Sequence, residues 1–92
     1  MAIVTLRYWA AAKEAAGTAE ETITAGTLAE ALAAARGQAG RGGHAGQDSR
    51  LRAILARSSF LIDGTPVGTR APESVLLSNG AVIEVLPPFA GG

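Results

Sequence analysis

The chain has 92 residues, enough for one domain with a single hydrophobic core. Eight basic residues balance eight acidic ones and neither sign forms a long block, so neither a nucleic-acid surface nor a polybasic membrane patch is indicated. The absence of cysteine excludes a disulfide framework, a thiolate metal site and a cysteine nucleophile.

No stretch is typical of a targeting or membrane-spanning segment. Residues 1–6 are too short and too alternating for a signal peptide, and no apolar run approaches the length of a membrane span. We therefore expect a cytoplasmic protein that recognises its partners by shape and apolar contact.

The first part of the chain predicts two short strands on either side of a short helix. Residues 2–8 alternate in polarity, as in a half-buried strand. Residues 9–16 are rich in alanine and end at Gly17, which predicts a helix with a glycine C-cap. Residues 20–24 contain three β-branched residues and are expected to form a strand beside the first.

A capping box marks the start of the main helix. Thr27 and Glu30 have the spacing at which the hydroxyl and the carboxylate satisfy each other's free amides, so a helix begins at Leu28. Gly37 is the predicted stop. The apolar stripe of this helix, which we expect to pack across the sheet, consists of Leu28, Ala31, Leu32 and Ala35.

Residues 37–47 contain five glycines and no periodicity, which predicts a surface loop. A Walker phosphate-binding pattern is absent, and Lys13 is the only lysine of the chain. We interpret His44, the only histidine, as a solvated loop residue because no second metal ligand accompanies it. No metal site is predicted.

Residues 50–57 predict a further short helix, capped by Asp48 or Ser49. Its arginines are interpreted as a solvated face, although an acidic partner or phosphate is an alternative. The apolar stripe is Leu51, Ile54 and Leu55, and the arginines are Arg50, Arg52 and Arg57.

The last part of the chain predicts a hairpin and a final strand. Asp63 and Gly64 form a tight turn after a strand at residues 59–62, and Pro66 marks the second arm as a sheet edge. The final strand, residues 81–86, follows a turn with the sequence Ser-Asn-Gly. The core positions predicted from the alternation of the first and last strands of the chain are Val4, Leu6, Ile83 and Val85.

The final strand runs directly into a short apolar tail. Pro87 and Pro88 cannot donate to a sheet ladder, so they end regular structure. Gly91 and Gly92 lack a Cβ and can enter a slot too narrow for a side chain. Terminal glycines are often only frayed ends, but a strand, a proline pair and an uncharged tail favour a functional one. We expect a domain at 1–86 and a flexible tail at 87–92.

At these residues the sequence resembles the small sulfur-carrier proteins of the MoaD/ThiS type. The matching stretches are residues 84–92, residues 7–11 and residues 16–18. The ending Pro-Pro-x-x-Gly-Gly is most similar to that of the small subunit of molybdopterin synthase. The element order alone predicts an α+β domain with a mixed sheet covered on one face by a helix. The resemblance implies the ubiquitin-like β-grasp fold, with the first and last strands adjacent in the centre.

The resemblance also implies a chemistry for Gly92. Its carboxylate would be adenylated, converted to a thiocarboxylate, and used to donate sulfur to the cyclic pyranopterin precursor of the molybdenum cofactor. A partner related to ubiquitin-activating enzymes would bind the ATP, and a large synthase subunit would accept the loaded tail in a heterotetramer. The chain itself is expected to bind no cofactor and to be a non-catalytic subunit.

The remaining site residues are expected to contact these partners. Gly91 and Ala90 would thread the partner's channel, Phe89 would anchor the tail, and the proline pair would reduce the entropy lost on docking. Trp9 is either a core residue or part of an exposed apolar patch on the open sheet face. The further residues expected close together on that face are Pro66 and Leu86.

Three alternatives stay open. The protein could carry sulfur for thiamine or cysteine synthesis, where similar proteins also end in Gly-Gly. It could be a ubiquitin-like modifier whose activated Gly92 is joined to target lysines. It could be an interaction domain with an incidental Gly-Gly. The end of the sequence at Gly92 favours a carboxyl terminus made directly, without trimming.

Overall fold

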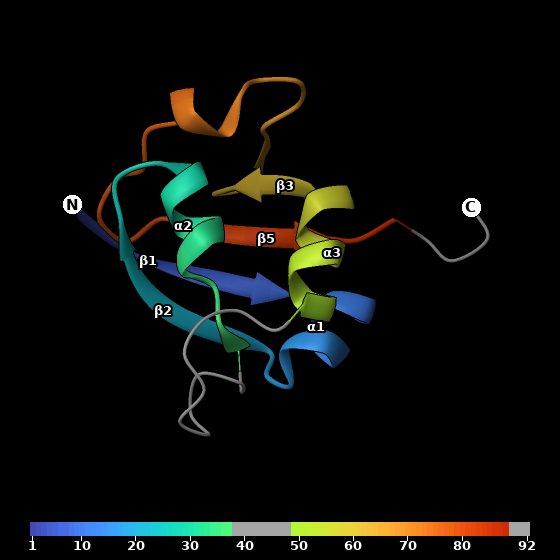
Figure 1. Cartoon of the computed structure of the whole chain (residues 1–92). Helices are drawn as coiled ribbons and strands as arrows, with labels where there is room; N and C mark the ends of the chain where they lie inside the picture. The colour runs from blue at the N-terminus through green and yellow to red at the C-terminus, as the bar shows by residue number, and fades with distance from the viewer. Residues whose placement is uncertain (38–48, 89–92) are drawn as a thin grey trace.

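The computed structural model describes residues 1–37 and 49–88, which form a mixed five-stranded sheet with helices over one face (Figure 1). The strands are β1 (Ala2–Tyr8), β2 (Glu20–Ala25), β3 (Ser59–Ile62), β4 (Thr65–Pro66) and β5 (Val82–Leu86). The helices are α1 (Ala10–Ala16), α2 (Leu28–Ala34) and α3 (Ser49–Arg57), with a 3₁₀ turn, η2, at Pro72–Ser74.

The first and last strands of the chain lie side by side, as the resemblance implied. The strand order is β2-β1-β5-β3-β4. β1 pairs parallel with β5, with Leu6 opposite Ile83, and antiparallel with β2. β3 pairs antiparallel with β5 and carries β4 on its outer side. β1 and β5, the first and last strands of the chain, are therefore neighbours in the middle of the sheet, although they are the most distant strands in the sequence.

The core lies between the sheet and the helices. All four core positions predicted from strand alternation are buried, with at most 1% of the surface of each residue exposed. Each helix adds buried residues of its own, so α1 and α3 share the covering of the sheet with α2. The predicted core positions are Val4, Leu6, Ile83 and Val85, and the helical contributors are Ala12, Ala16, Leu28, Ala31, Leu51 and Leu55.

The predicted start of α2 is confirmed and its predicted stop is wrong. Thr27 Oγ1 accepts from the N–H of Glu30 at 3.2 Å, and Glu30 Oε1 accepts from the N–H of Thr27 at 3.1 Å. The helix already ends at Ala34, because Ala35 turns to extended backbone. Gly37 instead has a φ of +57° and packs against α1, where a Cβ would stand 2.4 Å from the carbonyl oxygen of Ala16.

The third predicted helix, α3, begins one residue earlier than expected. Ser49 is its first residue rather than its cap, and the alternative cap, Asp48, lies outside the described residues, as does His44. The apolar stripe faces inward, with Leu51 and Leu55 buried. The three arginines of this helix are exposed, as expected.

The predicted hairpin is confirmed. Asp63 and Gly64 have φ values of 50° and 85°, the left-handed pair of a tight turn that fits the twist of two strands. Asp63 also ties the turn to β5, because its Oδ1 accepts from the N–H of Val82 at 3.0 Å and its N–H donates to the Val82 carbonyl at 2.9 Å. Pro66 lies on the edge strand β4.

None of the helices described, in residues 1–37 and 49–88, is long and apolar enough to cross a membrane.

Candidate functional site

The face of the sheet opposite the helices carries the described part of the predicted site. Alternation places Arg7 and Glu84 on this face, opposite each other in the parallel β1–β5 register. The same row continues through Leu61 on β3 to Pro66 on β4. We refer to this surface, with Trp9 and Leu86, as the open face.

Trp9 lies at the end of β1, where the chain turns into α1. It is the N-cap of that helix in extended backbone, and the next residue, Ala10, has a φ of +49°. A non-glycine residue in this region costs about 1–2 kcal/mol, so packing of the flanking elements holds the turn. Trp9 is 47% exposed, and its Nε1–H donates to Glu84 Oε1 at 3.2 Å. The structure thus supports the exposed-patch alternative for Trp9, not the core one.

Leu86 ends β5 two residues beyond Glu84, on the same face as the Trp9 indole. Leu86 and Pro87 are half-buried and Pro88 is exposed. The central strand therefore delivers the chain from the middle of the sheet, next to the tryptophan, into the tail. The four remaining site residues of the tail lie outside the described residues, and their roles stay predictions: Phe89, Ala90, Gly91 and Gly92.

Pro66 shares the open face but lies further away than expected. Its register partner is Leu61, whose partner on the next strand is Glu84. Two strand spacings of roughly 4.8 Å each therefore separate Pro66 from the β5 position that contacts Trp9. Pro66 belongs to the border of the open face, and Trp9 and Leu86 belong to its centre.

Charged side chains surround the tryptophan. Arg7 Nε lies 3.5 Å from Glu20 Oε2, and both side chains are about half exposed, so this ion pair is weak. Lys13 joins Arg7, Trp9 and Glu20 around a cavity of about 270 Å³. An aromatic ring bordered by side chains in weak contacts can rearrange to fit a partner's apolar and charged groups.

Glu21, the neighbour of Glu20 in β2, accepts hydrogen bonds on the covered side of the sheet. This role was not predicted from the sequence. Glu21 Oε2 accepts from the Tyr8 hydroxyl and from the N–H of Gly37, each at 2.6 Å, and Oε1 accepts from the N–H of Arg36 at 3.3 Å. Burial, together with the bond to the Glu21 carboxylate, raises the pKa of Tyr8 far above its usual value. Tyr8 is therefore a neutral structural donor.

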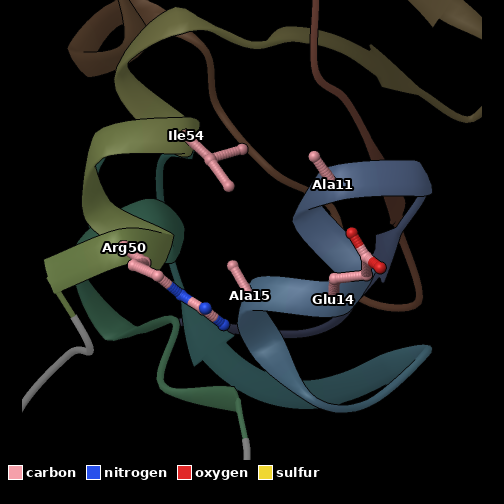
Figure 2. Close-up of a pocket in the computed structure, with 5 residues that line it drawn as sticks. All are labelled: Ala11, Glu14, Ala15, Arg50 and Ile54. Atoms are coloured by element: carbon pink, nitrogen blue, oxygen red, sulfur yellow. The ribbon is translucent and has the colours of Figure 1, made fainter. Parts of the chain in front are cut away.

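A wider cavity of about 510 Å³ lies on the helical side of the molecule. Figure 2 shows its lining side chains, which come from α1 and α3. They are Ala11, Glu14, Ala15, Arg50 and Ile54. Two alanines and Glu14 line the α1 side of this cavity, which lies away from the open face. Among the described residues, no group of three or more His, Cys, Asp or Glu side chains could hold a metal ion.

Solved structures with the same fold place the molecule among ubiquitin-like β-grasp domains. Small archaeal modifier protein 1 from Methanosarcina acetivorans aligns with a TM-score of 0.77 at 22% identity, over 100% of this chain and 98% of that one. The protein of the same name from Haloferax volcanii aligns with a TM-score of 0.70 at 17% identity, over 98% and 99%.

A third similar structure is a complex of subunits 1 and 2 of the molybdopterin-converting factor from Helicobacter pylori. It aligns with a TM-score of 0.61 at 21% identity, over 98% of this chain and 99% of the matched chain. At these identities the structures establish the fold. The chain matches no curated protein sequence.

The family is established by sequence. The model of the ThiS family matches residues 6–92, nearly the whole chain. The protein therefore belongs to the ThiS family of ubiquitin-like sulfur carriers. The matched range begins within β1 and includes β5 and residues 87–92.

Proposed function

We propose that this protein is the sulfur-carrier subunit of a molybdopterin synthase, with the sulfur held as a thiocarboxylate on Gly92. The observation that carries the proposal is the continuity of β5 with the tail. The most central strand of the sheet passes the exposed Trp9 indole and leaves through Leu86 and a proline pair. The start of the tail, at Leu86 and the proline pair, thereby lies next to an exposed surface to which a partner can bind.

The chemistry requires partners that supply the activation. The Gly92 carboxylate attacks the α-phosphate of ATP on an activating enzyme, which forms an acyl adenylate and releases pyrophosphate. A persulfide on the partner displaces AMP, and reductive cleavage of the resulting acyl disulfide by a thiol leaves the thiocarboxylate. In this proposal the chain contributes binding and positioning: the open face docks the partner and the two terminal glycines enter its active site.

Two features favour the molybdopterin branch of the family. The proline pair before the last four residues fits that branch, and it lowers the entropy lost when a tail is ordered in a partner. In addition, the Helicobacter pylori relative was solved in complex with subunit 2 of its molybdopterin-converting factor. We propose a corresponding large subunit as the acceptor, in a heterotetramer.

The first test is the intact mass of the protein recovered from its own cells. We expect an increase equal to the exchange of one oxygen for one sulfur, localised by fragmentation to Gly92. A variant extended by one alanine after Gly92 should acquire no sulfur. The matched control carries the extra alanine before Met1, which is exposed, and should load normally. Sulfur on the tail-extended variant would contradict the proposal.

Co-purification assigns the branch. A large synthase subunit bound to the loaded protein supports the molybdopterin role. A thiazole synthase in its place supports a role in thiamine synthesis, with the same thiocarboxylate serving a different acceptor.

The similarity to two small archaeal modifier proteins favours one second candidate, a protein modifier. In that case the activated Gly92 would be joined to a lysine amine of a target, with AMP as the leaving group. Extracts would then contain larger species in which Gly92 is joined to a target lysine by an isopeptide bond, and these would disappear when Gly92 is deleted. Their absence in cells where the protein is loaded with sulfur would exclude this candidate.

A further inference from the structure

The two edges of the sheet differ in how they are protected. β4, at one edge, has two residues and includes Pro66, which has no N–H to extend a ladder. β2, at the other edge, has six residues and contains neither proline nor lysine, and its two charged residues, Glu20 and Glu21, are confined to its first two positions. Natural sheets usually blunt a long edge with such residues, because unpaired backbone groups recruit other strands. The β2 edge is thus open to strand pairing.

The hydrogen bonds identify which residues of β2 turn their backbone outward. The N–H of Tyr8 donates to the carbonyl of Ala19 at 2.8 Å, in the same register that pairs β1 with β2. Bonded pairs alternate along an antiparallel ladder, so Ile23 directs its backbone groups to β1. Thr22 and Thr24 direct theirs away from the sheet.

The outward groups of both threonines are free within residues 1–37 and 49–88, and both residues are exposed. The preceding outward position is partly covered, because the Thr18 hydroxyl donates to the carbonyl of Glu20 at 3.1 Å. The accessible part of the edge therefore consists of two outward residues that flank Ile23.

We propose that the β2 edge pairs with β2 of a second copy of this chain, antiparallel about a two-fold axis at Ile23. In this register Thr22 of each copy lies opposite Thr24 of the other. The two pairs form four backbone hydrogen bonds, which use the free groups of both threonines and no others. Threonine pairs opposite each other are also favourable on a sheet surface.

The side chains of β2 fit this register. Ile23 is only partly buried against the core, and the two-fold places it against its counterpart on the helical side. The acidic residues Glu20 and Glu21 come to lie opposite the neutral Gly26 and Ala25 of the second copy. A parallel arrangement in register would instead oppose acidic residues. The charge pattern thus selects the antiparallel pairing.

The pairing closes on itself and leaves the carrier site free. The two-fold uses the same edge twice, and Pro66 blocks the opposite edge, so assembly stops at a dimer. The exit at Leu86 belongs to β5, which β1 separates from the paired edge. A ten-stranded sheet with two loaded tails results. Because the proposed contact consists of four backbone hydrogen bonds and the facing Ile23 side chains, we expect a weak association that depends on concentration.

Sedimentation of the full chain from micromolar to millimolar concentration tests the proposal. We expect the average mass to rise above 9.2 kDa by up to twofold, with slowed exchange of the Thr22 and Thr24 amides. The T22K/T24K variant puts lysine opposite lysine in both pairs and should stay monomeric. The T22K/T24E variant puts opposite charges in both pairs and should dimerise at lower concentration, with an advantage that salt removes.

The matched control is T65K/T69K, which makes the same changes at exposed threonines near the β4 edge and should dimerise like the unmodified protein. A chain that stays monomeric at millimolar concentration would overturn the proposal. The same conclusion would hold if another segment of the chain or another protein occupied the β2 edge. A dimer that T22K/T24K does not weaken would also overturn it. Sulfur loading of Gly92 is measured separately, so failure here leaves the proposed function intact.

Discussion

The two faces of the sheet share the same strands and have opposite properties. On the covered face, Leu6 and Ile83 are fully buried in a core cluster to which all three helices contribute. On the open face, the neighbouring positions Arg7 and Glu84 remain partly accessible, and Trp9 is held there by a single hydrogen bond from its indole. Successive residues of one strand thus belong to different environments.

This difference separates stability from recognition. The covered face supplies the apolar burial that drives folding, at roughly 25 cal/mol per Å². The open face makes few internal contacts, so a partner can displace them at little cost. The tail leaves from β5, which takes part in both faces. Substitutions on the covered face should therefore reduce the free energy of unfolding, and substitutions on the open face should change binding with little effect on stability.

The largest effect is expected at Leu6. Leu6→Ala removes a fully buried side chain between β2 and β5 and should lower the free energy of unfolding by about 2–5 kcal/mol. The control is Ile3→Ala on the opposite face of the same strand, where the side chain is 56% exposed. Its cost should be below about 1 kcal/mol. Urea denaturation measures both, and equal losses would contradict the separation of the two faces.

A smaller loss is expected where the chain after α2 packs on α1. Gly37→Ala places a methyl group 2.4 Å from the Ala16 carbonyl oxygen and demands a positive φ of alanine, so we expect a loss of about 2–4 kcal/mol. Gly64→Ala is the control, because that glycine also has a positive φ but meets no atom within 4 Å. It should cost about 1 kcal/mol, the conformational strain alone. The denaturation midpoints of the two variants are compared, and the additional loss in Gly37→Ala measures the cost of the close contact with Ala16.

Because the Tyr8 hydroxyl is buried, we expect the free energy of unfolding to depend on pH in the alkaline range. Burial and Glu21 raise the pKa of Tyr8 in the folded state, so stability is complete below the unfolded tyrosine pKa of about 10 and is lost at higher pH. Tyr8→Phe should cost about 1 kcal/mol at pH 8. This deficit should shrink by up to about 1.4 kcal/mol for each pH unit above 10. Denaturation at several pH values measures it, and a constant deficit would contradict the assignment.

The sequence predicts most of the fold because local signals and burial agree. Strand alternation identifies Val4 and Val85 as core residues, and the capping box identifies the start of α2. The end of α2 was mispredicted because Gly37 has a tertiary role, a close approach to Ala16, which no local pattern reveals. Glycine at a helix end and glycine at a packing contact look alike in sequence.

The positions of the described candidate residues could be predicted only where they depend on the central pair of strands. Trp9 and Leu86 follow from the ends of two adjacent strands. The distance of Pro66 depends on β3 lying between β4 and β5, which strand alternation does not determine. The role of Glu21 depends on backbone amides 15 and 16 residues away, and a Glu-Glu pair gives no sign of which carboxylate faces inward.

That Glu-Glu pair offers the smallest and most local comparison of the two faces. Glu20 faces outward in a half-exposed ion pair with Arg7, whereas Glu21 accepts from three donors on the covered side. Glu20→Gln should change the free energy of unfolding by less than about 0.5 kcal/mol, because exposed pairs are screened by solvent. Glu21→Gln is the reference and should cost clearly more, since it weakens charge-assisted bonds to Tyr8 and the chain after α2. Urea denaturation at low and high salt measures the free energy of unfolding of both variants. Equal losses would mean that the open face stabilises the fold as much as the covered face does, and that docking there would compete with folding contacts.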